Sequence, residues 1–454
     1  MTTKAHYTGV KAVQTPRFYK QWMLAGNPSN FTEELIRNFG DFVHYRGLIE
    51  FYLINDPDLI KQVLRDTHRS FDKNTVIYNR FRNALGNSLV NAEGKHWQKQ
   101  RRLIQPAFGP KAVKSFYNIM VTASQDIVDR WQIHADNQQS FDVSNEMNLL
   151  TLEIAGKSLF SDGFTTKAAD IRRWTQVINR YSAKPPLPIV GHPDFPTPMN
   201  LQLKRVLKEY SSFIHEMINR RMKGGSPDDL LSVFLSIEDD ETGEKMEISE
   251  IAEEVLGMII GGHETSSTAL TWIFYELHKH PKVEAKLNHE LQHVTANKPL
   301  QFEQVTELRY MKAVIEEAMR LHPPLWFENR NTKEDVKLGN SVIPQGSMVA
   351  LSRYALQRNP KVWERPNEFD PTRFLSEDND AAKKHKADGA YIPFSSGPRV
   401  CIGRHFAMME LMVILSTILQ NYEIKVSTKN TFKVAANLTM ELRDGLLIEL
   451  TNRK

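Results

Sequence analysis

The sequence predicts an α-dominated α+β fold, and three observations support this prediction. Most of the chain carries apolar residues at helical spacing, and the segments that alternate like strands are short. No Gly/Ser-rich linker and no internal repeat divides the 454 residues. We therefore expect one domain over 1–454, with a mixed, β-rich lobe at 1–70, a mainly helical lobe at 71–454 and minor β structure near both termini.

Helices are predicted where apolar residues recur every three or four positions. The clearest is 249–280, where Ser249 can cap the helix start and Pro281 lies just past its end. Asp56 can cap another helix, with Pro57 at its first position. The full set of predicted helices is 32–39, 57–66, 96–106, 113–134, 168–181, 201–221, 249–280, 306–321 and 404–420.

Strands and irregular segments fill the rest of the chain. The predicted strands are 43–45, 50–54, 336–338, 348–351 and 446–450. The segment 184–198 carries six prolines, which exclude a helix and leave either a plain connection or a mobile lid over a pocket. The segment 364–374 mixes Pro, Asp, Asn and Arg and is predicted to be irregular.

Composition excludes several classes of protein. The chain has 58 basic and 54 acidic residues, a net charge of +4, which is too mild to indicate a nucleic-acid binder. The apolar stretches 255–260 and 411–419 are far shorter than the roughly 20 residues that span a bilayer. The N-terminus has no apolar run, so we expect a cytoplasmic protein without a signal peptide or membrane anchor.

Cys401 is the only cysteine, which excludes an intramolecular disulfide and any cysteine-rich zinc or iron–sulfur site. It lies just before the predicted helix 404–420, where backbone N–H groups and the helix dipole favour a thiolate. Gly397 and Gly403 permit a tight turn and close approach of a flat ligand, and Arg399 suits a carboxylate. The alternative is a buried structural cysteine, a common environment for this residue type.

Residues 394–403 read Phe-Ser-Ser-Gly-Pro-Arg-Val-Cys-Ile-Gly. This segment resembles the haem-binding loop of cytochromes P450, Phe-x-x-Gly-x-Arg-x-Cys-x-Gly, in all five fixed positions. The resemblance implies a cytochrome P450 fold in which 71–454 binds haem b. It also implies that Cys401 is the thiolate ligand of the iron, with Phe394, Arg399 and Gly403 in the cofactor site.

Gly261 and Gly262 lie inside the predicted helix 249–280, although each glycine costs about 1 kcal/mol against alanine there. Either a ligand approaches closely or another helix crosses at this point. With Glu264 and Thr265, the segment resembles the distal-helix motif of the family, (Ala/Gly)-Gly-x-(Asp/Glu)-Thr. The resemblance implies that Glu264 and Thr265 are catalytic and relay protons for oxygen activation.

Glu317 and Arg320 are neighbours on one face of a predicted helix. The pair Glu34 and Arg37 has the same spacing, so an ordinary surface ion pair is the alternative. The order of the later segments distinguishes the Glu317–Arg320 pair from the Glu34–Arg37 pair, because only Glu317 is followed closely by a proline-rich bend and then by the cysteine loop. This order resembles the Glu-x-x-Arg helix and meander of the family, which implies a buried structural triad completed by Arg373.

Three further residues are assigned to the cofactor by the resemblance. Trp97 and Arg101 lie one turn apart on a predicted helix, and the family uses this pattern to contact a haem propionate. Arg330 follows a Pro-Pro bend, where the family often has another propionate-binding arginine. Without the resemblance, the Trp97 pattern would indicate only an amphipathic surface helix.

A predicted basic face is formed by Lys95, Lys99, Arg102 and Arg404. In the family such a face receives electrons from a redox partner, whereas plain solvated charge is the alternative.

The resemblance also suggests a substrate pocket built from four mostly apolar segments, as small-molecule pockets usually are. For each residue, the alternative is ordinary core packing. The predicted pocket residues are Tyr78, Phe81, Leu89, Val255, Met258, Ile259, Gly262, Leu325, Trp326, Phe327, Leu438, Thr439 and Met440.

Together these observations predict a monomeric haem-thiolate monooxygenase that inserts one oxygen atom from O2 into a hydrophobic small molecule by hydroxylation or epoxidation. The chain has no Gly-x-Gly-x-x-Gly motif and no cysteine cluster, so we expect no fused reductase. NAD(P)H electrons would then arrive through a separate ferredoxin or flavodoxin with its reductase. The alternatives are a haem-thiolate isomerase or dehydratase, a peroxygenase, or a non-catalytic haem-binding protein. The Glu264–Thr265 pair argues against the isomerase and the peroxygenase.

Overall fold

The computed structural model describes residues 11–17, 19–20, 27–183, 194–224, 229–238, 243–375 and 389–453. These residues divide into two compact units. Unit 1 takes its residues from 1–75, 316–401 and 434–440, and unit 2 from 76–315, 402–433 and 441–454. Helices dominate and the sheets are small, so the predicted α-dominated α+β class is confirmed.

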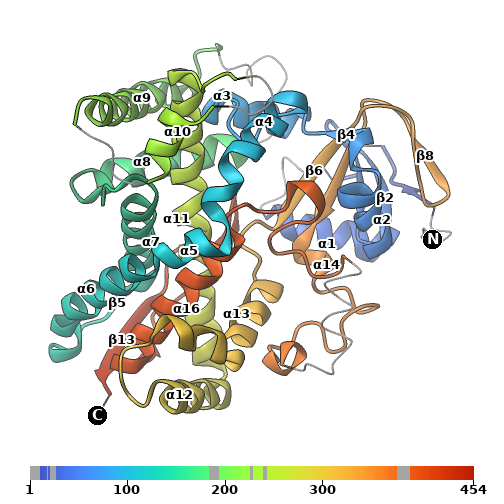
Figure 1. Cartoon of the computed structure of the whole chain (residues 1–454). Helices are drawn as coiled ribbons and strands as arrows, with labels where there is room; N and C mark the ends of the chain where they lie inside the picture. The colour runs from blue at the N-terminus through green and yellow to red at the C-terminus, as the bar shows by residue number, and fades with distance from the viewer. Residues whose placement is uncertain are drawn as a thin grey trace, which may run out of the picture. The chain divides into compact units, whose positions relative to one another are not determined.

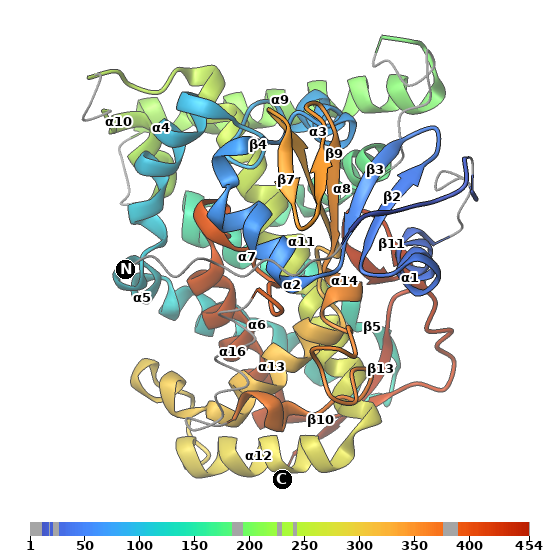
Figure 2. The same ribbon diagram turned by 90° about the vertical axis from the view of Figure 1, so that its right-hand side faces the viewer.

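Unit 1 contains a six-stranded sheet with the strand order β1-β2-β3-β9-β6-β4, part of which is seen in Figure 2. Its strands are β1 (Val13–Gln14), β2 (Phe42–Arg46), β3 (Glu50–Ile54), β4 (Phe71–Asp72), β6 (Phe327–Thr332) and β9 (Met348–Ser352). β3 pairs antiparallel with β2 and parallel with β9, and Tyr52 lies opposite Val349. The later strands β6 and β9 thus join the N-terminal sheet, so the β-rich part extends well beyond the predicted 1–70.

Short helices and turns complete unit 1. They are α1 (Pro28–Phe39), α2 (Pro57–Lys61), the π-helix η2 (Gln62–Asp66), η3 (His68–Ser70), α14 (Arg353–Leu356), η7 (Pro371–Phe374), η8 (Gly397–Arg399) and the hairpin β7 (Val336–Leu338)–β8 (Ser341–Ile343). Asp56 caps α2 as predicted, because its carboxylate accepts from the backbone N–H groups of Asp58 and Leu59 at 3.0 and 3.1 Å. The second half of the predicted helix 57–66 is π-helical. The segment 364–374 is irregular, as predicted, apart from the short η7.

Unit 2 is built around the helix α11 (Ile248–Lys279), which packs along α7 (Val143–Phe160) (Figure 1). The predicted helix 249–280 is therefore confirmed. The predicted Ser249 cap is wrong, because a reciprocal capping box between Glu247 and Glu250 starts the helix earlier. α11 also contacts α16 (Arg404–Asn421), the helix that follows the cysteine loop.

The other helices of unit 2 are α3 (Val76–Leu85), α4 (Gly94–Ile104), η4 (Gln105–Phe108), α5 (Pro110–Ser115), α6 (Tyr117–Asp136), η5 (Thr165–Lys167), α8 (Ala168–Ala183), α9 (Pro198–Gly224), α10 (Leu230–Ser236), α12 (Pro281–Thr295) and η6 (Phe302–Glu307). A three-stranded sheet has the order β10 (Tyr422–Val426), β13 (Leu447–Asn452), β5 (Phe141–Asp142). The remaining elements are α13 (Arg309–Leu321), β11 (Val434–Ala436) and β12 (Met440–Leu442). The sequence did not predict α3, α7, α10 or α12.

Two sequence predictions concern the proline-rich segment and the absence of a membrane-spanning helix. Most of the proline-rich segment 184–198 lies outside the described residues, and α9 begins at its last proline, Pro198. Among the described residues, no helix combines the length and the apolar character that a bilayer crossing needs.

Candidate functional site

The loop that carries Cys401 is fixed by backbone contacts within unit 1. The N–H of Cys401 donates to the carbonyl of Phe394 at 2.9 Å, and the N–H of Val400 donates to that of Gly397 at 3.1 Å. Gly397 has φ +71°, and a Cβ there would lie 2.1 Å from the carbonyl oxygen of Leu64 in η2. Only glycine therefore fits at this position, and the loop is pressed against η2.

The Cys401 side chain is exposed, so the alternative of a buried structural cysteine does not apply. It lies just ahead of α16, whose N-cap is Gly403. A Cβ at Gly403 would meet no atom within 4 Å. An accessible thiol close to a helix N-terminus, in a loop with little side-chain bulk beside it, fits a thiolate that ligates a haem iron.

Arg330 and Arg399 also belong to unit 1. Arg399 is half-buried in η8, whereas Arg330 is buried in β6. Arg330 donates through Nη2 to Oε1 of Glu328 at 2.5 Å and through Nη1 to the carbonyl of Asn329 at 2.8 Å. Glu328 was not predicted from the sequence, although residues two apart on a strand share a face and this spacing could have indicated the pair.

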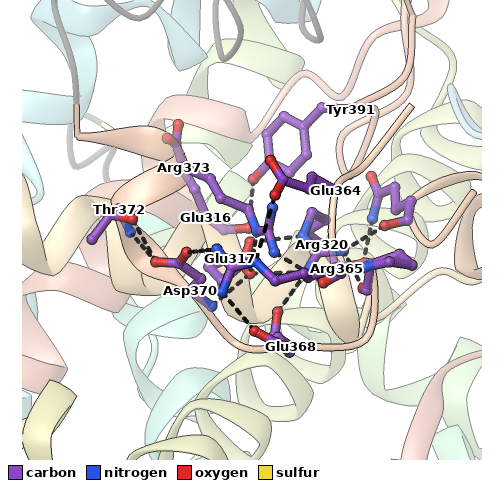
Figure 3. Close-up of polar contacts among 12 residues, drawn as sticks. Glu316, Glu317, Arg320, Glu364, Arg365, Glu368, Asp370, Thr372, Arg373 and Tyr391 are labelled. Atoms are coloured by element: carbon purple, nitrogen blue, oxygen red, sulfur yellow. Dashed lines mark hydrogen bonds and ion pairs between the residues drawn. The ribbon is translucent and has the colours of Figure 1, made fainter. Parts of the chain in front are cut away.

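The predicted triad is assembled in unit 1, as Figure 3 shows. Both oxygens of Glu317 accept from Arg320, at 2.7 and 2.8 Å, and Oε1 also accepts from Nε of Arg373 at 3.3 Å. The backbone N–H of Asp370 adds a bond of 2.9 Å to the same oxygen. Burial raises the pKa of Glu317, while the hydrogen bond and charge of Arg320 oppose this rise.

Arg320 uses all five of its N–H donors. Besides the two bonds to Glu317, it donates to the carbonyls of Gln357, Pro366 and Glu368 at 2.7, 2.7 and 3.0 Å. Its guanidinium also lies 5.0 Å from the ring centre of Trp363. Because the two charged side chains are fully buried, this complete pairing is what makes the network tolerable.

The distal-helix motif lies on α11 in unit 2. Glu264 is buried, and its Oε1 accepts from the side-chain amide of Asn179 on α8. The hydroxyl of Thr265 donates to the carbonyl of Gly261 at 2.9 Å. Burial lowers the pKa of His263 to about 4, so its ring is neutral. Nδ1 of His263 donates to the carbonyl of Ile259 at 2.5 Å, which leaves Nε2 as an acceptor.

A polar cavity of about 110 Å³ lies beside this motif within unit 2. Its lining includes His263, Glu264, Ser267, Thr175 and Asn148, from α11, α8 and α7. Nε2 of His263 and Oγ1 of Thr175 are buried and have no hydrogen-bond partner among the described residues. A polar cavity of this size with such atoms on its wall suits several ordered water molecules.

The two helix glycines have different surroundings. A Cβ at Gly262 would lie 3.5 Å from Ala155 on α7, whereas a Cβ at Gly261 would meet no atom within 4 Å. Gly262 therefore lies at the crossing with α7, whereas the space beside Gly261 is open. Gly262 also keeps some accessible surface, so its place among the predicted pocket residues stays a prediction.

Trp97 and Arg101 lie one turn apart on α4, and both side chains are half-buried. Nε of Arg101 donates to the side chain of Gln105 at 2.9 Å. In the predicted basic face, Lys99 forms an ion pair of 3.2 Å with Glu244, so part of its charge is balanced. Lys95 and Arg404 are exposed.

The predicted pocket residues fall into two groups. Seven are half-buried and keep accessible surface: Tyr78, Phe81, Met258, Gly262, Leu325, Phe327 and Leu438. Six others are packed in the interior: Leu89, Val255, Ile259, Trp326, Thr439 and Met440. Within unit 1, for example, Trp326 and Met440 share a core cluster, and the indole N–H of Trp326 donates to the carbonyl of Asn437 at 2.9 Å.

Comparison with known proteins agrees with these features. The cytochrome P450 family profile matches residues 14–446 of the chain. The chain belongs to the cytochrome P450 family and is a monooxygenase, an oxidoreductase that incorporates oxygen from O2. Membership implies a haem bound through a thiolate, a small-molecule substrate and a redox partner.

Two relatives come from Streptomyces. Cyclooctat-9-en-7-ol 5-monooxygenase of Streptomyces melanosporofaciens is 31% identical over 422 residues, which cover 92% of this chain and 90% of the relative. Pentalenene oxygenase of Streptomyces avermitilis is 30% identical over 436 residues, covering 95% and 94%. The crystal structure of the cytochrome P450DA haem domain superimposes with a TM-score of 0.86 at 26% identity and covers 97% of both chains.

Proposed function

We propose that this monooxygenase hydroxylates or epoxidises a hydrophobic small molecule, using haem b and electrons from NAD(P)H that a separate redox protein delivers. The observation that carries the proposal is the exposed Cys401 thiol at the end of a hydrogen-bonded loop and ahead of α16. The dipole and the N–H groups at the start of α16 favour the thiolate form of this side chain. Haem supplies the binding and activation of dioxygen when it is bound.

The proposed cofactor residues come from three separate parts of the sequence: the Cys401 loop, the strand β6 and the helix α4. Cys401 ligates the iron, and Gly403 leaves room for the flat ring because a Cβ there meets nothing within 4 Å. Arg330 and Arg399, with Trp97 and Arg101, hold the propionates by charge and by N–H donation. Phe394, whose carbonyl accepts from the Cys401 N–H, completes the proposed cofactor site. Glu317, Arg320 and Arg373 have a structural role.

Proton delivery is assigned to Glu264 and Thr265. Oxygen activation needs protons from solvent, and the polar cavity beside Glu264 suits the water that would supply them. The amide of Asn179 orients the Glu264 carboxylate, and the bond to Gly261 sets the Thr265 hydroxyl. A neutral His263 leaves an acceptor nitrogen for a water in the same cavity.

The half-buried pocket candidates are apolar or aromatic, which favours a hydrophobic substrate. The two Streptomyces relatives are named for cyclooctat-9-en-7-ol and for pentalenene. We therefore propose cyclic terpenoids as the first substrate class to test, followed by fatty acids, steroids and polyketides. A substrate-induced change in the iron spin state identifies binders.

The class of chemistry is tested on the purified haem protein. Reduction under carbon monoxide should give the far-red-shifted Soret band that a thiolate ligand produces. Cys401→Ser should lose this band. A wild-type protein without the band would contradict the thiolate assignment. Isotopically labelled O2 should then place one labelled oxygen atom in the product.

The proton assignment has its own test. Thr265→Ala should raise the peroxide released per NAD(P)H consumed, because proton delivery no longer matches oxygen reduction. Thr417→Ala is a matched control, since the Thr417 hydroxyl also donates to a carbonyl one turn back, at 2.8 Å, on α16. An unchanged coupling ratio in Thr265→Ala would count against the relay.

A further inference from the structure

Glu328 is a buried carboxylate that three segments of unit 1 share. Its Oε1 accepts from Arg330 of the same strand at 2.5 Å and from the hydroxyl of Ser395 in the cysteine loop at 3.1 Å. Its Oε2 accepts from Nη2 of Arg353 on α14. The Glu328 side chain is only 6% exposed, so water contributes little to these contacts.

The charge of Glu328 is maintained by its neighbours. Burial opposes ionisation, but the charges of Arg353, Arg330 and Lys73 outweigh burial and hold the pKa of Glu328 well below its usual range. A buried charge of this kind depends on partners with good geometry, because removing one partner leaves another charge uncompensated. Arg353 is fixed in turn by the carbonyl of Leu325, to which its Nη1 donates at 2.9 Å.

Ser395 has an unusual backbone conformation, with φ +62°. A non-glycine residue in the left-handed region costs free energy and persists where surrounding contacts determine it. Two contacts do so here: the N–H of Ser395 donates to the carbonyl of Ile392 at 3.0 Å, and its hydroxyl donates to Glu328. The next residue back, Phe394, accepts the bond from the Cys401 N–H.

We infer that Glu328 is a positioning residue for the haem-thiolate centre, acting through Ser395 on the loop that presents Cys401 and through its ion pair on Arg330. The inference rests on the proposed function, because that function places both the cysteine loop and Arg330 at the haem. Glu328 is proposed neither as an iron ligand nor as a substrate contact; it acts through Ser395 and Arg330. Its single carboxylate sets both the conformation of the loop that carries Cys401 and the direction of the Arg330 side chain.

The first test removes only the hydrogen bond between Ser395 and Glu328. Ser395→Ala deletes the hydroxyl that reaches Glu328, and Ser396→Ala is a matched control, since the neighbouring Ser396 makes no capping bond to the turn that follows. Both are made in the full-length haem protein. Ser395→Ala should shift the iron reduction potential and increase the share of reduced carbon monoxide complex that lacks the red-shifted band. Ser396→Ala should match the wild type in both.

The second test changes the carboxylate. Glu328→Gln keeps the shape but removes the charge, and should shift the reduction potential further and speed haem dissociation several-fold. Glu328→Asp keeps the charge and should recover part of both properties. If Glu328→Gln does not fold, the serine pair still decides the question.

The outcomes separate the inference from the proposed function. If Ser395→Ala and Ser396→Ala have the same potential and the same carbon monoxide spectrum, Glu328 acts only on the fold and the inference fails. If the wild type itself lacks the red-shifted band, the thiolate assignment fails, whatever the serine variants show.

Discussion

Arg320 shows how one residue can tie distant segments together. Its guanidinium is fully buried, so each unsatisfied N–H would cost free energy that water could not restore. Five acceptors prevent this, two from Glu317 and three from backbone carbonyls between Gln357 and Glu368. The planar guanidinium is suited to such a set, and the point charge of a lysine is not.

Arg320→Lys should therefore lower the free energy of unfolding by about 3 kcal/mol or more. Lysine has fewer N–H donors than arginine, and each buried acceptor left without a partner costs about 1–3 kcal/mol. Arg37→Lys is the control, because Arg37 is exposed and a surface change of this kind stays within about 0.5 kcal/mol. Denaturant unfolding of both variants measures the difference. Equal stabilities would show that the five acceptors contribute little.

The same comparison shows what spacing alone can predict. Glu34 precedes an arginine by three residues, as Glu317 does. Its carboxylate, however, accepts from Lys20 at 2.6 Å and from Tyr19 at 2.8 Å at a partly exposed site. Spacing predicts both helical pairs equally. The carbonyls that bury Arg320 come from residues about 40 positions later, so no local pattern contains them.

At the scale of elements, helices with a regular apolar period could be predicted from the sequence. Elements that are buried on several faces, or that bury polar residues, could not. α11 was predicted almost in full, because its apolar residues recur at helical spacing and Pro281 lies just past its end. α7 was missed because its buried residues occur on nearly every face, which removes the helical period. β6 was missed because Glu328, Asn329 and Arg330 look like exposed polar chain, whereas all three are buried and bonded.

The cysteine loop requires glycine at position 397 because of a contact with Leu64, which lies far away in the sequence. Gly397→Ala should destabilise the loop in two ways: the left-handed backbone costs about 1–2 kcal/mol, and the new Cβ would meet the Leu64 carbonyl at 2.1 Å. Gly346→Ala isolates the first effect, because Gly346 has φ +78° and open space around it. The free energy of unfolding and the retention of haem should both fall further in Gly397→Ala than in Gly346→Ala. Equal losses in the two variants would rule out an effect of the contact with Leu64.

Gly261 offers a test of ligand approach to α11. In the protein itself, Gly261→Ala should stabilise the helix by up to about 1 kcal/mol, because alanine is the better helix former. If a ligand needs the space, the same variant should weaken carbon monoxide binding to the reduced haem protein. Gly262→Ala is the control on the α7 side, where a Cβ makes an ordinary contact of 3.5 Å. Unchanged binding in both variants would refute the close-approach interpretation.

At the scale of the whole molecule, buried acids make stability depend on pH. Glu410 on α16 and Glu254 on α11 are both buried, and burial raises the pKa of each carboxyl group to about 8. In the folded chain these groups hold a proton that the unfolded chain releases at lower pH. The folded state therefore loses stability as pH rises from about 4.5 towards 8.

Glu410→Gln should remove one such dependence. The variant should gain stability relative to the wild type by up to about 1.4 kcal/mol per pH unit between the two pKa values, and the gain should level off above pH 8. Denaturant unfolding from pH 5 to 8.5 measures it. Glu307→Gln, at an exposed site, should follow the wild type throughout. A gain for Glu410→Gln that does not grow with pH would contradict the assignment of a neutral buried acid.

The π-helix η2 has a consequence for insertions and deletions. A π-turn holds one residue more than an α-turn over the same length, so deleting one residue from Gln62–Asp66 would let α2 continue as a regular helix. The Leu64 carbonyl would then turn away from Gly397, and the steric demand for glycine in the cysteine loop would ease. In this chain, a one-residue deletion within Gln62–Asp66 should therefore make Gly397→Ala less harmful than it is beside the intact π-turn.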